Sequence, residues 1–216
     1  MTRARWARAA GLATLAALLM LAGFVLRPAL VPESHSAPPV LTPTEIGFAE
    51  DMTAHHEQAL LMTQRLDAGV DPAIRRLAQQ IADTQRLEIG TMLGWLRLAN
   101  ASPTNPHPMN WMHAASTTHD HASMTTGAAE STRMPGMATL AELDALSAAR
   151  GADAETQFLQ LMQRHHRGGV AMAQAVDKLV ESGAVKEAAR GMISGQSQEA
   201  GIMTLLLAQR GVQPLS

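Results

Sequence analysis

The stretch FAEDMTAHHEQALLMTQRLD (residues 48–67) returns later in the chain as FLQLMQRHHRGGVAMAQAVD (residues 158–177). The identities share one constant offset: Phe48/Phe158, Met52/Met162, His55/His165, His56/His166, Met62/Met172, Gln64/Gln174 and Asp67/Asp177. Further on, with one extra residue in the second copy, four more positions match: Gln85/Gln196, Glu88/Glu199, Met92/Met203 and Leu96/Leu207. The chain therefore contains two copies of one structural unit.

Each copy has the spacing of an amphipathic helix. Apolar residues recur at steps of four and three from Phe48 to Leu66, and again from Phe158 to Val176. A capping box at Thr42–Glu45 predicts the start of the first helix, which we expect to run to about Ala68. Asp71 and Pro72 predict the start of a second helix. Because the turn between the two helices is short, each unit is expected to be an antiparallel helical hairpin.

The hairpins define the organisation of the chain. We predict the first hairpin at residues 44–101 and the second at residues 152–212. Between them we expect a mobile His- and Met-rich loop at residues 102–137 and a short helix at residues 138–151. Asp153 is the expected cap of the following long helix. One hairpin cannot bury its apolar stripe alone, so the fold class predicted is all-α, a four-helix bundle.

The N-terminal residues predict export. Arg3, Arg5 and Arg8 precede an uncharged run from Ala9 to Leu26, which is just long enough to cross a bilayer. Arginines ahead of such a run place the N-terminus in the cytoplasm and the rest of the chain outside. Residues 1–27 are therefore either a signal peptide or a membrane anchor, and residues 28–43 form a Pro- and Ser-rich linker. The expected location is the periplasm or the cell surface.

Composition narrows the possible functions. The sequence has no cysteine, so disulfides, thiolate metal sites and cysteine nucleophiles are excluded. The formal net charge is -2 and the chain has no long basic run, so the sequence gives no sign of the basic surface that nucleic-acid binding needs. Aromatic residues make up only 3% of the chain, which favours helices over sheets. The unusual residues are the 14 methionines and 9 histidines.

Polar residues interrupt the predicted core. His55 and His165 stand in the apolar stripes, and Gln85, Glu88, Gln196 and Glu199 interrupt those of the second helices. One interpretation is a structural network in which Glu88 and Glu199 satisfy His55 and His165. The next residue, His56, lies about 100° further round the helix and is expected to face another helix or solvent. The other interpretation is a metal site, since a metal ion also satisfies such groups.

The loop favours the metal site. It repeats the His and Met chemistry in a stretch with little packing reason for methionine: Met109, Met112, His113, His119, His121, Met124, Met134 and Met137. Thioethers combined with imidazoles, without cysteine, are the ligand set that suits Cu(I) and, by the same softness, Ag(I).

Several spaced motifs resemble a known family. F-x3-M-x2-HH, then Q-x2-E-x3-M, then MPGM before a short helix and a second HH motif, are similar to the pattern of the domain of unknown function 305 (DUF305) family. The resemblance covers roughly residues 44–210. It implies a ferritin-like four-helix bundle, commonly exported, in a family that includes periplasmic copper-binding proteins implicated in copper and silver tolerance. It points to these ligands: Met52, His55, His56, Met62, Met162, His165, His166, Met172, Met134 and Met137.

Two other functions stay open. A ferritin-like metalloenzyme such as a metal-ion oxidase is disfavoured, because di-iron bundles use Glu-x-x-His motifs and the chain has none. A purely structural or interaction bundle is the third possibility. We expect a non-enzymatic copper-binding protein, with a copper exporter or another extracytoplasmic copper protein as a candidate partner. An uncleaved N-terminal segment would add a membrane contact.

Overall fold

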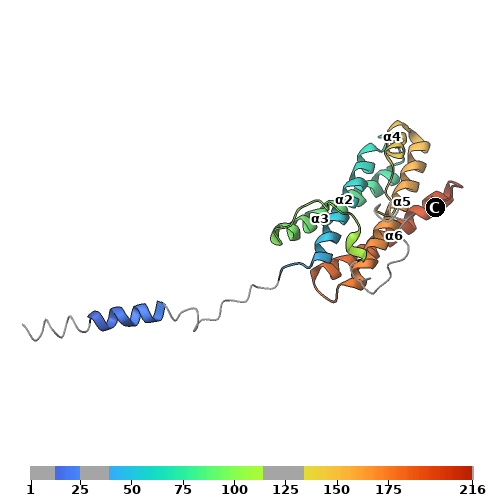
Figure 1. Ribbon diagram of the computed structural model, residues 1–216. Helices are drawn as coiled ribbons and strands as arrows, with labels where there is room; N and C mark the ends of the chain where they lie inside the picture. The colour runs from blue at the N-terminus through green and yellow to red at the C-terminus, as the bar shows by residue number, and fades with distance from the viewer. Residues whose placement is uncertain (1–12, 25–38, 114–133, 216) are drawn as a thin grey trace, which may run out of the picture. The chain divides into compact units, whose positions relative to one another are not determined.

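The computed structural model describes residues 13–24, 39–113 and 134–215. Contacts divide the chain into two units, Met1–Pro39 and Val40–Ser216. The second unit, called here the helical body, holds the elements α2 (Pro43–Arg65), α3 (Pro72–Leu98), η1 (Asn110–His113), α4 (Leu140–Ala148), α5 (Gly151–Leu179) and α6 (Ala184–Gln209), drawn in Figure 1. Every regular element within the described ranges is helical, which confirms the all-α prediction.

Local sequence signals begin most of these helices. Thr42 and Glu45 form a capping box at the start of α2, and Thr139 and Glu142 form another at α4. Asp71 caps α3 by accepting a hydrogen bond from the backbone N–H of Ala73.

The predicted Asp153 cap of α5 is wrong. The helix already begins at Gly151, whose φ of 51° lies in the left-handed region that glycine adopts easily. The Gly151 N–H donates to the carboxylate of Asp67, 3.1 Å away at the end of α2. A distant residue therefore does what a local cap was expected to do.

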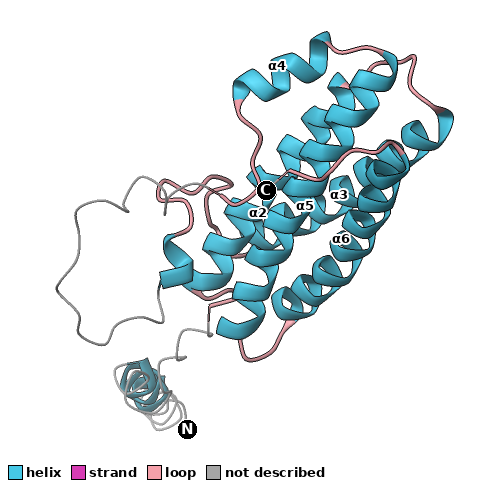
Figure 2. Ribbon diagram, turned by 90° about the vertical axis from the view of Figure 1, so that its right-hand side faces the viewer, coloured by secondary structure: helices cyan, strands magenta, loops and turns pink. Residues whose placement is uncertain are grey.

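Two hairpins meet along their first helices. Helix α2 packs against α3, and α5 packs against α6. The hairpins join through contacts between α2 and α5, while the short α4 lies across one end and contacts both. Figure 2 shows α2, α3, α5 and α6 side by side with α4 at their end.

The apolar core has two halves that mirror the repeat. Phe48, Met52 and Met172 lie in one cluster, and Phe158, Met162 and Met62 lie in the other. Each half thus contains one methionine from each copy of the repeat. One of them, Met52 or Met162, lies three residues before the twin histidines of its copy. The other, Met172 or Met62, lies seven residues after the first histidine of the other copy. All four of these methionines are fully buried, and each contributes about 1.5–3 kcal/mol by burial.

The start of the predicted loop is ordered, contrary to expectation. Met109 and Trp111 are buried against α2, with Trp111 packed edge-on against Phe48 at a ring-centroid distance of 5.6 Å. The buried carboxylate of Asp51 accepts hydrogen bonds from the Met109 backbone N–H and from the Trp111 indole N–H, at 2.7 and 2.8 Å. Gly47 leaves room for the ring, because a Cβ there would approach Trp111 to 2.9 Å.

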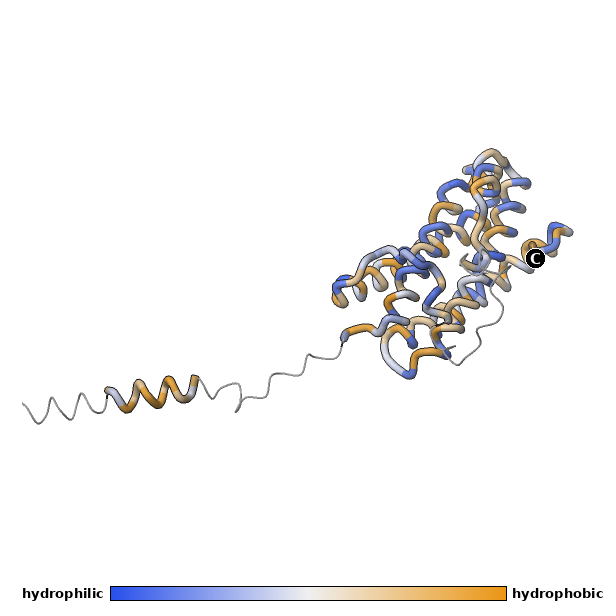
Figure 3. Tube along the Cα trace, in the orientation of Figure 1, coloured by the Kyte–Doolittle hydropathy of each residue, from blue (hydrophilic) through white to orange (hydrophobic). Residues whose placement is uncertain are grey.

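The N-terminal unit is described only in part. Residues 13–24 are helical and mostly apolar, whereas polar and apolar residues mix along the helices of the body (Figure 3). No helix among the described residues combines the length and hydrophobicity needed to span a membrane. The remainder of the predicted signal peptide or anchor at residues 1–27 lies outside the described residues, as does most of the 28–43 linker.

Candidate metal centre

Four histidines form a buried layer between the two halves of the core. The side chains of His55, His56, His165 and His166, called here the histidine layer, are all 0% exposed. The rings of His55 and His165 lie against each other across the α2–α5 contact, with centroids 3.8 Å apart and planes tilted by 31°. Equivalent residues of the two copies thus meet at the middle of the helical body.

The outer histidines bond to the core carboxylates. Nε2 of His56 lies 2.7 Å from Oε2 of Glu88, and Nε2 of His166 lies 2.8 Å from Oε2 of Glu199. The prediction that Glu88 and Glu199 satisfy His55 and His165 is therefore wrong. His56 turns toward α3 and not toward solvent, so the neighbour of the predicted core histidine is the one that reaches the carboxylate.

The inner histidines bond to backbone carbonyls. Nε2 of His55 lies 2.9 Å from the Pro135 carbonyl oxygen, and Nε2 of His165 lies 2.9 Å from the His55 carbonyl oxygen. A carbonyl oxygen only accepts, so each of these Nε2 atoms must carry the proton. In a neutral ring, Nδ1 is then the unprotonated nitrogen with a free lone pair.

All four Nδ1 atoms of the layer are unsatisfied. Each is buried and has no hydrogen-bond partner within the described part of the chain. Buried polar atoms in proteins nearly always have a partner, so this set requires an explanation, and a bound ion is one of the usual ones. In metal-binding histidines, a carboxylate or a carbonyl commonly accepts the N–H of one ring nitrogen and thereby leaves the other nitrogen free for the metal, which is the arrangement seen here with Nε2 and Nδ1.

Burial keeps the inner rings neutral. Desolvation is the main cause that lowers the pKa of His55 to about 3, with the nearby histidines adding to it and the Pro135 carbonyl opposing it. The pKa of His165 is lowered well below its ordinary value, again chiefly by burial. A neutral imidazole is the form that binds a metal, so no proton competes for Nδ1 near pH 7.

The MPGM segment lies directly on the layer. Pro135 bonds to His55, and the backbone of residues 134–138, called here the covering segment, touches α5 so closely that a Cβ on Gly168 would come within 2.0 Å of the Pro135 oxygen. The amide of Gln58 holds the end of this segment, accepting from the Ala138 N–H at 2.6 Å and donating to its carbonyl at 2.9 Å. Met134 and Met137, which belong to this segment, are half-buried.

Two further predicted ligands, Met109 and Met112, lie in or against the core and apart from the histidine layer. Met109 is a buried core residue under the η1 turn, and Met112 is partly buried against the same half of the core. His113 ends η1. The predicted ligands His119, His121 and Met124 lie outside the described residues. Sequence reasoning missed Gln58, Asp51 and Gly168. Of these three residues, only Gly168 has a local signal in the sequence, because it is a glycine inside a predicted helix, in the stretch HHRGG.

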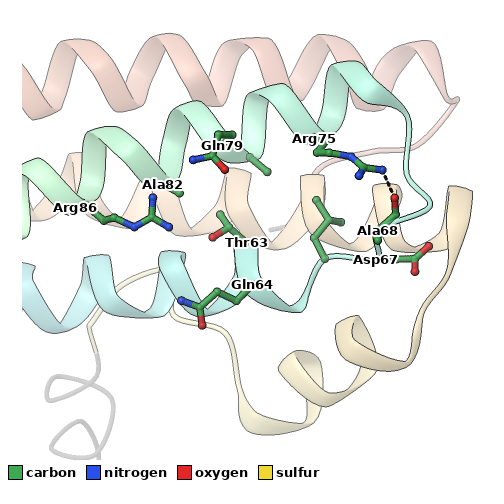
Figure 4. Close-up of a pocket in the computed structure, with 10 residues that line it drawn as sticks. Thr63, Gln64, Asp67, Ala68, Arg75, Gln79, Ala82 and Arg86 are labelled. Atoms are coloured by element: carbon green, nitrogen blue, oxygen red, sulfur yellow. Dashed lines mark hydrogen bonds between the residues drawn. The ribbon is translucent and has the colours of Figure 1, made fainter.

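A surface hollow near the α2–α3 turn is not part of the centre. It measures about 310 Å³ and is lined by groups such as Thr63, Gln64 and Arg86 (Figure 4). Its lining contains neither histidine nor methionine. Arg75 extends there to the Ala68 carbonyl and so closes the turn between the helices.

The donor set of the layer fits a soft metal ion. Across residues 13–24, 39–113 and 134–215, no three His, Asp or Glu side chains stand close enough together to hold an ion. Imidazole nitrogens and thioether sulfurs are the ligand types that Cu(I) prefers. Met52, Met62, Met162 and Met172 flank the histidines in sequence and lie in the two core halves on either side.

Comparison with known proteins gives a family and a fold. The family profile described as a domain of unknown function, DUF305, matches residues 45–207. The crystal structure of a DUF305 protein from Streptomyces coelicolor is 38% identical, covers 80% of this chain and 96% of its own, and superposes with a TM-score of 0.68. A DUF305 fragment from Deinococcus radiodurans is 30% identical, with coverages of 80% and 99% and a TM-score of 0.64.

A third solved structure shares the fold at lower identity. It is a protein called CopM in its Cu(I)-bound form, 24% identical over 76% of this chain and 96% of that one, with a TM-score of 0.54. The search of curated proteins found no match.

Proposed function

The chain belongs to the DUF305 family, and we propose that it is an exported protein that binds and sequesters copper, as Cu(I), without catalysing a reaction. The observation that carries the proposal is the buried histidine layer with four unsatisfied Nδ1 atoms. Silver, as Ag(I), is expected to bind in the same way because it shares the softness of Cu(I).

Ligand chemistry supports the choice of metal. The site offers neutral imidazole nitrogens and thioether sulfurs, and the sequence has no cysteine. A di-iron centre needs several carboxylates pointing into the core, whereas Glu88 and Glu199 are each engaged by a histidine. A metal-ion oxidase is therefore the weaker proposal.

The relatives support the same proposal indirectly. CopM is described in a Cu(I)-bound form, and the Streptomyces coelicolor protein is described as a candidate secreted protein. Together with the basic and apolar N-terminal residues, this supports export by a signal peptide or a membrane anchor at residues 1–27. A copper exporter or another extracytoplasmic copper protein is the partner that would deliver or receive the ion.

The finer fold assignment belongs to the same proposal. We infer that α2, α3, α5 and α6 form a ferritin-like four-helix bundle. Two hairpins packed through their first helices, with a long connection between them, support this class. Sites in such bundles are built from side chains on facing helices, which is how His55 and His165 are presented.

The competing account is that the layer only holds the helices together. A competition titration of the purified protein with a coloured Cu(I) chelator at pH 7 separates the two accounts. His55→Leu combined with His165→Leu fills the same space with apolar side chains, and His107→Ala, at an exposed position, is the control.

We expect the double variant to remain folded and to lose at least about tenfold in Cu(I) affinity, equivalent to about 1.4 kcal/mol. The His107→Ala protein should bind as the unmodified protein does. Unchanged binding by a folded double variant would show that the inner histidines are structural.

A further inference from the structure

A polar cleft lies between α3 and α6. It has a volume of about 180 Å³, and its lining includes Gln85, Glu88, Gln196 and Glu199. These four residues occupy matching positions in the two copies of the repeat. The cleft therefore presents the same amide and carboxylate pair from both hairpins.

The two amides in the cleft lack partners. Gln85 is 1% exposed and Gln196 is 3% exposed, and neither the nitrogen nor the oxygen of either amide has a hydrogen-bond partner among the described residues. Gln196 reaches down to α5, because a Cβ on Gly169 would come within 2.3 Å of its Oε1. An unsatisfied buried amide is unfavourable, so these groups favour the binding of a polar or ionic ligand.

The carboxylates connect the cleft to the histidine layer. The side chain of Glu88 is 22% exposed and that of Glu199 is 9% exposed, while their partners His56 and His166 are completely buried. Among the residues that the structure describes, no lysine, arginine or histidine lines the cleft. Two carboxylates without a cationic neighbour in the lining attract a positive ion and repel anions.

The covering segment lies on a different part of the histidine layer from the part that the cleft carboxylates contact. Pro135 accepts from His55, and the backbone contact at Gly168 leaves no room even for a methyl group. The carboxylates of the cleft, in contrast, bond directly to the layer and also line a space that opens to solvent.

We propose that the α3–α6 cleft is the entrance through which the metal cation reaches the histidine layer. The inference rests on the proposed copper binding and adds a second, transient site to it. The carboxylates attract the incoming cation by charge, and because carboxylate and amide oxygens bind a soft ion only weakly, the ion is not retained in the cleft. The cation then passes to the imidazoles of His56 and His166.

Gly195 allows a clean test. It lines the cleft, and a Cβ there meets nothing within 4 Å, so the first atom of a side chain can be added without displacing a neighbour. Gly195→Lys places a positive charge and bulk at the cleft. Gly201→Lys is the matched control, because Gly201 lies on the same helix, is equally open and does not line the cleft.

The measurement is the association and dissociation of Ag(I) with the purified protein, followed by stopped-flow tryptophan fluorescence, with calorimetry for Kd. An obstructed entrance slows both directions equally, so Gly195→Lys should lower both rates by about tenfold and leave Kd within about twofold. Gly201→Lys should match the unmodified protein. Melting temperatures check that both variants are folded.

Equal association rates for Gly195→Lys and Gly201→Lys would overturn the entrance while leaving copper binding intact. A weaker Kd at Gly195→Lys with an unchanged association rate would overturn it as well, because the charge would then act only on the bound ion. Absence of Ag(I) binding by the unmodified protein in calorimetry would overturn the proposed function, and the entrance with it.

Discussion

His55 and His56 are adjacent in the sequence but have different chemical surroundings. The ring of His55 faces its counterpart His165 and donates to a backbone carbonyl, whereas the ring of His56 faces α3 and bonds to Glu88. The repeat predicted that His55 and His165 occupy equivalent core positions in the two hairpins. It could not show which histidine bonds to the carboxylate. That depends on how α2 is rotated against α3, and the spacing of residues in the sequence fixes their relative positions only to within about one helical turn.

The neutral inner histidines make the metal-free protein sensitive to acid. The pKa of His55 falls to about 3 on folding and that of His165 is also lowered, so below pH 6.5 the unfolded chain binds protons that the folded chain does not. This contribution to stability is complete above about pH 6.5 and is lost as the pH falls. Urea unfolding should show a loss of about 2 kcal/mol from His55 between pH 7.5 and 5, with a further loss from His165 in the same direction.

The control for this prediction is the protein with His55→Leu and His165→Leu, which should have a flatter profile in the same range. Carboxylates titrate mainly below about pH 5 in the unfolded chain, so they do not account for the effect in this window. Identical profiles for the two proteins would mean that the inner rings are protonated in the folded state.

At the scale of elements, short connections hold the site together. The covering segment is fixed by Gln58 at its end and by Pro135 on the layer, and η1 is fixed by Asp51. The helices and their order were predictable from caps and apolar spacing. These attachments were not, because each joins residues more than fifty positions apart, and a polar residue inside a helix gives no sign of such a partner.

A methyl group on Gly168 should disturb the covering segment. Its Cβ would lie 2.0 Å from the Pro135 oxygen, a backbone atom that cannot turn aside. We expect Gly168→Ala to destabilise the protein by about 1–3 kcal/mol in urea unfolding. Gly201→Ala, where a Cβ meets nothing within 4 Å, should instead stabilise by about 0.5–1 kcal/mol. Two equal and small effects would contradict the close contact.

The Asp51 carboxylate should be needed to hold residues 105–113 on α2. Asp51→Ala leaves the N–H groups of Met109 and Trp111 without an acceptor, at a cost of about 1–3 kcal/mol. Limited proteolysis should then cut within this stretch sooner than in the unmodified protein. The exposed Asp83→Ala serves as control and should change stability by less than about 0.5 kcal/mol. Unaltered cleavage in Asp51→Ala would show that other contacts suffice.

At the scale of the whole molecule, the repeat places one site between two similar halves. Each hairpin contributes two histidines to the layer, and the first helix of each hairpin contributes one methionine to each core cluster. A metal ion bound there would connect the hairpins. The two-hairpin organisation followed from the sequence alone, because the copies share both spacing and residue identity, but the contact between His55 and His165 required the α2–α5 packing seen in the structure.

Binding of a metal between the hairpins should stabilise the entire helical body. A ligand present at 100 times its Kd, without affinity for the unfolded chain, adds about 2.7 kcal/mol. Ag(I) should therefore raise the melting temperature of the unmodified protein in a single cooperative transition, and raise it less in His55→Leu with His165→Leu. Stabilisation of equal size in both proteins would place the metal outside the layer.

The most direct test of the account is the state of the histidine ring nitrogens. Nitrogen NMR of protein labelled with ¹⁵N-histidine distinguishes a protonated, a free and a metal-bound nitrogen at each ring. In the metal-free protein at pH 7, His55 and His165 should carry the proton on Nε2 and have a free Nδ1. Addition of Ag(I) should shift Nδ1 of the layer while the Nε2–H signals of His55 and His165 persist. Full Ag(I) binding with all four Nδ1 signals unchanged would contradict the central claim that this layer is the metal centre.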